Sequence, residues 1–294
     1  MAEKNKIKTL VCAGDSWVFG SEICDPKIVE RYPSSVHIGN YDHMEENDAY
    51  RIPRIFPTKL AKQFSADCVN VAFPAYDNQS ICNTTIEYIS KHYINQGKST
   101  DDIFVVVGWS SPERARFWYK DDKVSHKHIL WPSLEWFDNK QQKQFWQLYV
   151  SYFWNKEDYI PRFVDTVLRL QNFCNEHKIK YLMFNAFYQG QGSGCSHDYS
   201  DDANIANELA SLSADGYCVT VNNKRIDANL YDFTQPWATV DSIRYYCKDQ
   251  PINSFRSFIT ENAKVPLAGN HPSEEGHSLW AKELYRYIVE NKLA

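Results

Sequence analysis

Residues 7–17, IKTLVCAGDSW, carry a short apolar run into a glycine, an aspartate and a serine. A run of this length that ends at glycine is typical of a buried strand. Ser16 then lies on the turn that leads from the strand into the next helix. There its hydroxyl can project from the sheet edge as a nucleophile, while backbone N–H groups of the turn face a developing oxyanion. The alternative is a helix N-cap, for which serine and aspartate are both favoured.

Strand-like and helix-like segments alternate along the rest of the chain. The predicted strands that follow the first are residues 68–73, 102–109 and 179–187. The predicted helices are residues 56–64, 78–94, 141–154, 160–177, 201–212 and 273–291. This alternation indicates an α/β fold with a mostly parallel sheet covered by helices on both faces. Ligands of such sheets lie outside the carboxyl ends of the strands, so the residues that follow each strand are candidates for a site.

Two segments fit no regular hydrophobic period, namely residues 116–140 and 213–252. The first is rich in aromatic residues, and we interpret residues 113–160 as an insertion or cap within a single domain of residues 1–294. Its aromatic side chains either form a satellite core or a dimer face, or they cover the cleft and bind an acyl or sugar group. The aromatic residues in question are Trp118, Tyr119, Trp131, Trp136 and Phe137.

The composition bears on partners and compartment. Of 294 residues, 43% are apolar, so the chain can bury a sizeable core. The net charge of −5 gives no electrostatic reason to expect a nucleic acid or an anionic membrane as partner. The sequence shows no run of 18 apolar residues, no signal-peptide pattern and no CxxC pair among its eight cysteines. These features favour a cytoplasmic protein with reduced thiols. The oligomeric state stays open.

Polar residues follow the second and third predicted strands. After the second, the backbone N–H near Ala75 and the side chain of Asn78 can point into one cleft. After the third, Ser110 can donate a hydrogen bond and Arg114 can bind an anion or a carboxylate. Turns and helix caps are the alternative for all of them. The residues that we expect to contact a substrate are Asp15, Trp17, Asn78, Trp109 and Arg114.

Two histidines stand just before and within the start of the last predicted helix. His271 can serve as a general base that takes a proton from a serine hydroxyl. His277 follows Gly276 in the first turns of the helix, and we interpret it as structural. His126 and His128 have no neighbouring cluster of Cys, Asp or Glu, so we expect them to be solvated rather than metal-bound.

Four stretches, taken together and in this order, resemble the SGNH, or GDSL-like, hydrolases. AGDSWVFG (13–20) resembles the first sequence block of that family, and NVAFPAYDN (70–78) is similar to the second. VVVGWSS (105–111) is similar to the third block and GNHPSEEGH (269–277) to the fifth. The resemblance covers residues 8–112 and 265–290. It implies a three-layer α/β/α domain of flavodoxin-like type that hydrolyses acyl esters without a metal or another cofactor.

Carried over by position, the resemblance assigns roles to individual residues. It implies Ser16 as nucleophile and His271 as general base. The oxyanion donors would be the backbone N–H groups of Ser16 and Ala75 and the side chain of Ser110. Ala75 replaces a glycine of the family pattern, which leaves a backbone donor in place. Ser110 replaces an asparagine, and its hydroxyl has a shorter reach.

The third departure from the family pattern is Ala268, which stands where an aspartate usually precedes the histidine by three residues. Without a carboxylate, nothing obvious holds the imidazole tautomer. Three explanations stay open: an engineered inactivating substitution, a Ser–His dyad oriented by a backbone carbonyl, and a pseudoenzyme that only binds. A carboxylate could also come from elsewhere in the chain, and the candidates are Asp198, Asp232 and Asp241.

The sequence therefore predicts a serine esterase or acylhydrolase that acts on a small or carbohydrate-linked acyl ester. The alternatives are a catalytically impaired binding protein with the same fold and an acyltransferase that uses the same acyl-enzyme chemistry.

Overall fold

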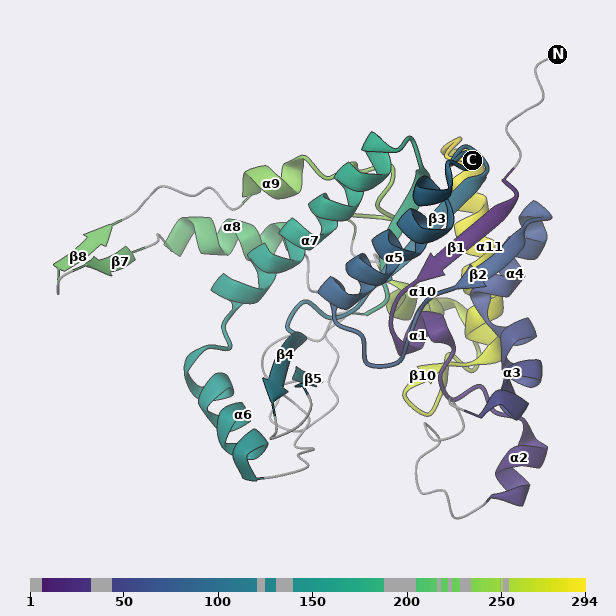
Figure 1. Cartoon of the computed structure of the whole chain (residues 1–294), viewed down its shortest axis with the longest axis horizontal. Helices are drawn as coiled ribbons and strands as arrows, with labels where there is room; N and C mark the ends of the chain where they lie inside the picture. The colour runs from purple at the N-terminus through teal and green to yellow at the C-terminus, as the bar shows by residue number, and fades with distance from the viewer. Residues whose placement is uncertain are drawn as a thin grey trace.

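The computed structural model describes residues 7–32, 44–120, 125–130, 140–187, 205–215, 218–221, 224–227, 234–248, 250 and 254–294. Its centre is a four-stranded sheet in the order β2-β1-β3-β6, with every neighbouring pair parallel. The strands are β1 (Thr9–Ala13), β2 (Asp67–Asn70), β3 (Ile103–Trp109) and β6 (Lys180–Asn185). Figure 1 shows β1, β2 and β3 side by side between α5 and α4.

Alternate residues of the strands face two separate hydrophobic cores. In β1, Val11 and Ala13 belong to one core, whereas Leu10 and Cys12 belong to the other. The same alternation runs along β3 and β6, as expected for strands that are buried on both faces. The predicted α/β architecture with a parallel sheet between two helical layers is confirmed.

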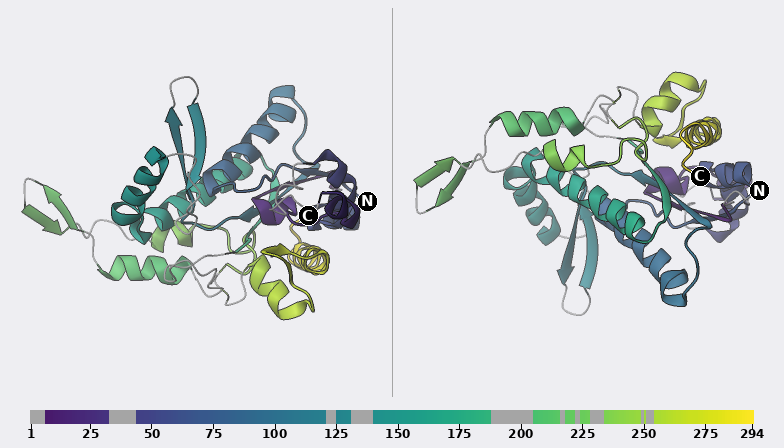
Figure 2. Two further views of the ribbon diagram at one scale, coloured as in Figure 1. Left: turned by 90° about the horizontal axis from the view of Figure 1, so that it is seen from below. Right: turned by 90° about the horizontal axis from the view of Figure 1, so that it is seen from above.

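Each core is completed by its own helices, and Figure 2 shows the two helical layers on either side of the sheet. The first layer contains α5 (Asn78–His92), α7 (Lys156–Glu176), α8 (Ile205–Asp215) and α9 (Thr234–Ala238). The second contains α1 (Ser16–Phe19), α4 (Phe56–Phe64), α10 (Phe255–Asn262) and α11 (Glu274–Glu290). The remaining helices are α2 (Pro26–Arg31), α3 (Glu45–Arg51), α6 (Lys140–Tyr152) and the 3₁₀ turns η2 (Ile52–Arg54) and η3 (Ile94–Gln96).

The predicted elements agree well with those of the structure. The helix predicted at residues 56–64 is α4 without any shift of its ends, and the last helix ends one residue early. β2 ends at Asn70 rather than at residue 73, although Val71 and Phe73 still donate hydrogen bonds to the Cys12 and Gly14 carbonyls. The chain beyond these residues leaves the sheet to reach α5, which explains the early end.

The prediction that residues 116–140 lack regular structure was wrong in its first half. β4 (Ala115–Lys120) and β5 (Ser125–Leu130) form an antiparallel hairpin. The hairpin was hard to recognise because β4 has three aromatic residues in a row and β5 begins with four polar residues, so neither strand alternates apolar with polar residues. The poorly patterned stretch 213–252 contains a second hairpin, β7 (Cys218–Val221) with β8 (Lys224–Asp227), and α9.

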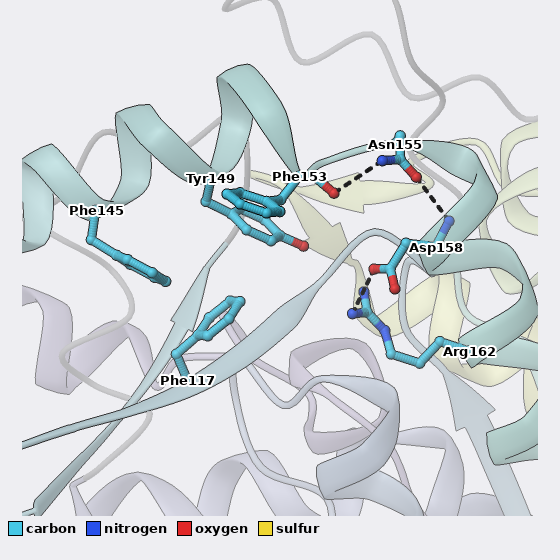
Figure 3. Close-up of a pocket in the computed structure, with 7 residues that line it drawn as sticks. All are labelled: Phe117, Phe145, Tyr149, Phe153, Asn155, Asp158 and Arg162. Carbon is cyan, nitrogen blue, oxygen red and sulfur yellow. Dashed lines mark hydrogen bonds and ion pairs between the residues drawn. The ribbon is translucent and has the colours of Figure 1, made fainter. Parts of the chain in front are cut away.

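The aromatic insertion has a small core of its own. Phe117 of β4 contacts Phe145 and Tyr149 of α6, with ring centroids 5.0 and 5.1 Å apart. Beside these rings lies an open cavity of about 500 Å³, shown in Figure 3. Its lining residues are Phe117, Phe145, Tyr149, Phe153, Asn155, Asp158 and Arg162. A satellite core is therefore present. A role as a substrate cap or dimer face stays a prediction, and Trp131, Trp136 and Phe137 lie outside the described residues.

Candidate active site

Ser16 is the first residue of α1 and directly follows the carboxyl end of β1. The helix cap is Asp15 rather than Ser16, because the Asp15 carboxylate accepts a hydrogen bond from the Trp17 backbone N–H at 3.0 Å. The capping role that competed with the nucleophile prediction is thus filled by the neighbouring residue. The Ser16 hydroxyl is left to interact across the cleft.

His271 meets Ser16 from the other end of the chain. Its Nε2 lies 2.8 Å from Ser16 Oγ, within hydrogen-bond distance. His271 belongs to a minimal hairpin in which β10 (His271–Pro272) pairs with β9 (Leu267–Ala268). The imidazole also packs against Trp17, with ring centroids 6.4 Å apart. The structure brings together the two residues that the sequence singled out, although they are 255 positions apart.

The carboxylate next to His271 comes from Glu22, which the sequence analysis missed. Glu22 Oε2 lies 3.2 Å from His271 Nδ1, the ring nitrogen opposite to the one that faces Ser16. The same oxygen accepts a hydrogen bond from the Asn270 backbone N–H at 2.8 Å. Burial by itself would raise the pKa of Glu22, but the His271 imidazole and the N–H groups of Asn270 and His271 outweigh it and lower that pKa. Glu22 is therefore a carboxylate at neutral pH.

The backbone around Glu22 explains how a residue six positions after Ser16 reaches the histidine. α1 has only four residues and ends at Gly20 in the left-handed conformation, with φ of 85°. The chain then folds back, because the N–H groups of Gly20 and Ser21 both donate to the Ser16 carbonyl. Glu22 itself has φ of 68°, which is uncommon for a residue with a side chain and typical of strained functional positions.

Of the carboxylates considered from the sequence, Asp241 is the one that the structure describes, and it lies away from the histidine. Asp241 accepts backbone hydrogen bonds from Ile243 and Arg244. It lies near Tyr181, at the amino end of β6 and thus at the sheet edge opposite to Ser16. Asp198 and Asp232 lie outside the described residues. Ala268 pairs with His271 across the β9–β10 hairpin, and the acid expected at this position is supplied by Glu22.

Gly269 makes room for the Glu22 carboxylate. It adopts φ of 68°, and a Cβ at this position would lie 2.3 Å from Glu22 Oε2. The absence of a side chain at Gly269 is therefore a condition for the contact between Glu22 and His271. The loop residues 268–270 therefore leave space for a carboxylate that comes from another loop.

Gly269→Ala is expected to push the Glu22 carboxylate away from His271 and lower the kcat for an ester about 10- to 100-fold, since small misplacements of catalytic groups are costly. Gly97→Ala is the matched control. Gly97 has a similar φ of 64°, but a Cβ there would meet nothing within 4 Å. The control should lose about 1 kcal/mol of stability and keep its kcat. Equal kcat losses in both variants would contradict this role of Gly269.

The turns after β2 and β3 flank the nucleophile turn, because β1 lies between these two strands in the sheet. Ala75 has φ of 64°, a conformation that suits the glycine of the family pattern. Asn78 accepts a hydrogen bond from the Ser110 N–H at 2.8 Å and donates one to the Ser110 carbonyl at 3.0 Å. Its amide thus fixes the turn after β3, which corrects the prediction that Asn78 contacts substrate. The buried Ser110 hydroxyl has no hydrogen-bond partner among the described residues, so it can donate to an oxyanion.

The two tryptophans predicted to contact substrate are core residues. Trp109 is 0% exposed and packs edge-on against Phe163 on the α7 side of the sheet. This placement corrects its prediction, because the side chain of the last residue of β3 points into the core. Trp17 is also buried, where its ring contacts Phe187, Phe255 and the imidazole of His271.

Asp15 and Arg114 form a buried ion pair rather than a substrate-binding surface. Arg114 Nη1 lies 3.1 Å from Asp15 Oδ2, and the two side chains are 4% and 0% exposed. The guanidinium charge is thus used inside the protein. This finding corrects the prediction that Arg114 binds an anion from the substrate and that Asp15 contacts it.

His277 is structural, as expected. It is fully buried, stacks on Phe56 and accepts a hydrogen bond from the Phe56 N–H through Nδ1. Burial, followed by the positive charges of Lys59 and Arg51 and by His271, lowers the pKa of His277 from its usual 6.5 to about 3. The ring is therefore neutral in the folded protein.

The lowered pKa of His277 predicts a specific acid sensitivity. In the unfolded chain His277 takes up a proton below pH 6.5, whereas in the folded chain it does so only near pH 3. The free energy of unfolding therefore decreases as the pH is lowered from 6.5 towards 3. Between pH 7 and 5, this residue should cost about 2 kcal/mol of the free energy of unfolding. Urea titrations should show a pH dependence that is weaker by this amount in His277→Gln. Identical pH slopes in both proteins would refute the assignment.

Within the described parts of the chain, no three His, Cys, Asp or Glu side chains come close enough to hold a metal ion. The described helices also include none that is long and apolar enough to cross a membrane.

Comparisons with known proteins identify a family but no activity. A family model with the description "Family of unknown function (DUF6071)" matches residues 41–204, which begin after Ser16 and Glu22 and end before His271. A comparison with curated proteins gave no match.

Among solved structures, the chain is similar to the psychrotrophic esterase EstA from Pseudoalteromonas sp., with a TM-score of 0.45 and 7% identity over 96% of this chain and 97% of that chain. It is also similar to a carbohydrate esterase, with a TM-score of 0.39 and 13% identity over 99% of this chain and 67% of that chain. Because both TM-scores are below 0.5, the activity has to be inferred from the residues of this chain.

Proposed function

The chain belongs to a family of unknown function, DUF6071, and from its own residues we propose that it is a serine hydrolase that cleaves acyl esters. The observation that carries this proposal is the continuous chain from Ser16 Oγ through both nitrogens of His271 to the Glu22 carboxylate, with contacts of 2.8 and 3.2 Å. A nucleophile, a base and a group that orients the base within reach of one another are the requirement for nucleophilic catalysis by serine.

Ser16, His271 and Glu22 each have a defined task in the reaction. Ser16 Oγ attacks the carbonyl carbon of the ester while His271 Nε2 takes the hydroxyl proton. Glu22 holds the imidazole in the tautomer that carries its proton on Nδ1, and it stabilises the imidazolium that forms. When the tetrahedral intermediate collapses, His271 gives the proton to the leaving alcohol and the acyl group stays on Ser16. Water, activated by His271 in the same way, then releases the acid.

The turns after β2 and β3, on either side of the nucleophile turn, supply the oxyanion donors in this proposal. The left-handed turn at Ala75 lies beside the nucleophile turn, because the Phe73 N–H donates to the Gly14 carbonyl. The Ser110 hydroxyl, which has no hydrogen-bond partner among the described residues, is the side-chain donor, in place of the asparagine of the SGNH pattern. Donors that are fixed before the reaction stabilise developing charge without reorganisation.

The substrate that we propose is a small or carbohydrate-linked acyl ester. An acyltransferase would use the same acyl-enzyme and differ only in replacing water by another alcohol. Turnover of p-nitrophenyl acetate by the wild-type protein, abolished in step with modification of Ser16 by a fluorophosphonate probe, tests the proposal. A catalytically impaired binding protein predicts no modification of Ser16 even at high probe concentration.

The aromatic insertion offers a matched pair of variants to test its role in binding an ester substrate. Phe145 and Leu148 both lie on α6 and are 42% and 51% exposed, but only Phe145 lines the cavity. If the insertion binds the acyl or sugar part of the substrate, Phe145→Ala should raise the KM for an aryl or glycosyl ester severalfold, whereas Leu148→Ala should not. Equal KM values in both variants would leave the insertion with the role of a satellite core.

A further inference from the structure

Arg114 lies where three loops of the candidate site meet. It directly follows the turn after β3, and its side chain is buried against the turns after β1 and β2. A buried guanidinium is costly unless its charge and its N–H groups are satisfied. The partners that satisfy it here include the loops that carry the proposed nucleophile and the proposed oxyanion donor.

The first partner of Arg114 is the nucleophile turn. Arg114 Nη1 donates to Asp15 Oδ2 at 3.1 Å, and the other carboxylate oxygen of Asp15 accepts the Trp17 N–H at 3.0 Å. Asp15 and Trp17 are the two residues on either side of Ser16. The carboxylate is thus held from both ends, and with it the start of α1.

The second partner is the turn after β2. Arg114 Nη1 also donates to the Tyr76 carbonyl at 3.2 Å, immediately after Ala75. The guanidinium further lies 5.2 Å from the ring centroid of Phe187, which in turn packs on Trp17 at 5.2 Å. One side chain therefore bonds both to the turn that holds Ser16 and to the turn that holds Ala75.

The turn that carries Arg114 is itself fixed. Asn78 bonds to the Ser110 N–H, to the Ser110 carbonyl and to the Ser111 carbonyl at 2.8, 3.0 and 3.3 Å, and the Arg114 N–H donates to the Ser111 carbonyl at 3.2 Å. Asn78 is the first residue of α5, so a rigid helix holds the base of the arginine. These hydrogen bonds fix the backbone of the turn, so the Arg114 side chain extends from a fixed position.

We propose that Arg114 is a positioning residue, which keeps Ser16 and the oxyanion donor at Ala75 in register through Asp15 and Tyr76. This inference rests on the proposed serine hydrolase function. It concerns the transition state, because the register matters once the carbonyl oxygen moves toward the donors. Loss of Arg114 should therefore lower kcat and leave KM nearly unchanged.

The double variant Asp15→Asn/Arg114→Met separates positioning from stability. Arg114→Met alone leaves a buried carboxylate without its counter-charge, so it should unfold at a lower temperature as well as lose activity. The double variant removes both charges together and keeps an N-cap at position 15, and it should fold with a Tm close to that of the wild type. Its kcat for p-nitrophenyl acetate should still be about a hundredfold lower, with KM changed less than about threefold.

Arg114→Lys and a distant pair complete the design. A lysine keeps the charge beside Asp15 but lacks the planar fork, so its kcat should lie between those of the wild type and the double variant. Asp241→Asn/Arg244→Met is the control, because Arg244 pairs with Asp241, bonds to the Tyr181 carbonyl and lies over the Tyr181 ring, at the far edge of the sheet. The control should keep the wild-type kcat.

The outcomes distinguish the two levels of inference. If the wild type shows no turnover that depends on Ser16, the proposed function fails and the positioning role fails with it. If the wild type turns over the ester and the folded double variant does so with the same kcat, only the positioning role of Arg114 is overturned. Should the double variant not fold, Arg114→Lys decides, and a wild-type kcat in that variant would overturn the role equally.

Discussion

Ser16→Ala is expected to reduce the hydrolysis of p-nitrophenyl acetate on the order of 10⁶-fold, with no loss of the fold. The Ser16 hydroxyl is the only part of the side chain that the substitution removes. Among the described residues it forms a hydrogen bond with His271 Nε2, while the cap of α1 is made by Asp15. Kinetics and the melting temperature of the variant and the wild type are the measurements.

The variant Ser21→Ala is a suitable control for Ser16→Ala. Ser21 is also buried and follows the C-cap of the same short helix, but its hydroxyl has no hydrogen-bond partner among the described residues. It should retain activity. Residual Ser16-independent turnover close to that of the wild type would remove Ser16 from the mechanism and leave the protein as a binder.

Glu22→Gln is expected to lower kcat about 10²- to 10⁴-fold while the protein stays folded. The amide has nearly the shape of the carboxylate, but it carries no charge to stabilise the imidazolium of His271. Its NH₂ group would also favour the wrong tautomer of the ring. The control is Asp241→Asn, which neutralises another carboxylate at the opposite edge of the sheet and should leave kcat unchanged.

Ala268→Asp distinguishes a vacant triad position from one that is filled from elsewhere. In the wild-type background, a second carboxylate beside Glu22 should give no gain, because two like charges next to one imidazole oppose each other. In the Glu22→Gln background, the new aspartate should recover part of the lost kcat. A large gain in the wild-type background would show instead that Glu22 does not serve His271 and that the site lacks its acid.

The strands, and the positions of Ser16 and His271 in the site, could be predicted from the sequence because their signals are local. β1 and β3 are continuous apolar runs, and each ends in a turn with polar residues. Ser16 follows β1, and His271 stands just before the local start signal of α11, whose cap is Ser273. Parallel strands bring their carboxyl ends to one edge, so residues far apart in sequence were expected to meet there.

Glu22 was missed because its position depends on the path of a loop rather than on a periodic pattern. α1 lasts one turn, Gly20 reverses the chain and the glutamate itself takes a left-handed conformation. The signal that was available is the pair of glycines, Gly20 before Glu22 and Gly269 before His271, each with a positive φ. If the carboxylate is expected only three positions before the histidine, an acid that comes from another loop is overlooked.

The errors on Trp109, Asn78 and Arg114 share another cause. All three lie near the carboxyl ends of strands, but placement there does not fix the direction of a side chain. Trp109 alternates into the α7 core, Asn78 ties down a turn and Arg114 is neutralised by Asp15. The place of these residues at the carboxyl ends of strands was predicted correctly. The partners of their side chains could not be predicted, because they depend on packing between loops.

The rate at which a fluorophosphonate modifies Ser16, followed by intact mass in the wild type and in Glu22→Gln, tests the proposed triad most directly. The reaction uses the nucleophile, its base, the acid and the oxyanion donors, and it does not depend on knowing the substrate. The Ser16–His271–Glu22 arrangement predicts rapid stoichiometric modification of the wild type and at least about a hundredfold slower modification of the folded variant. Equal rates in the two proteins, or no modification of the wild type, would contradict it.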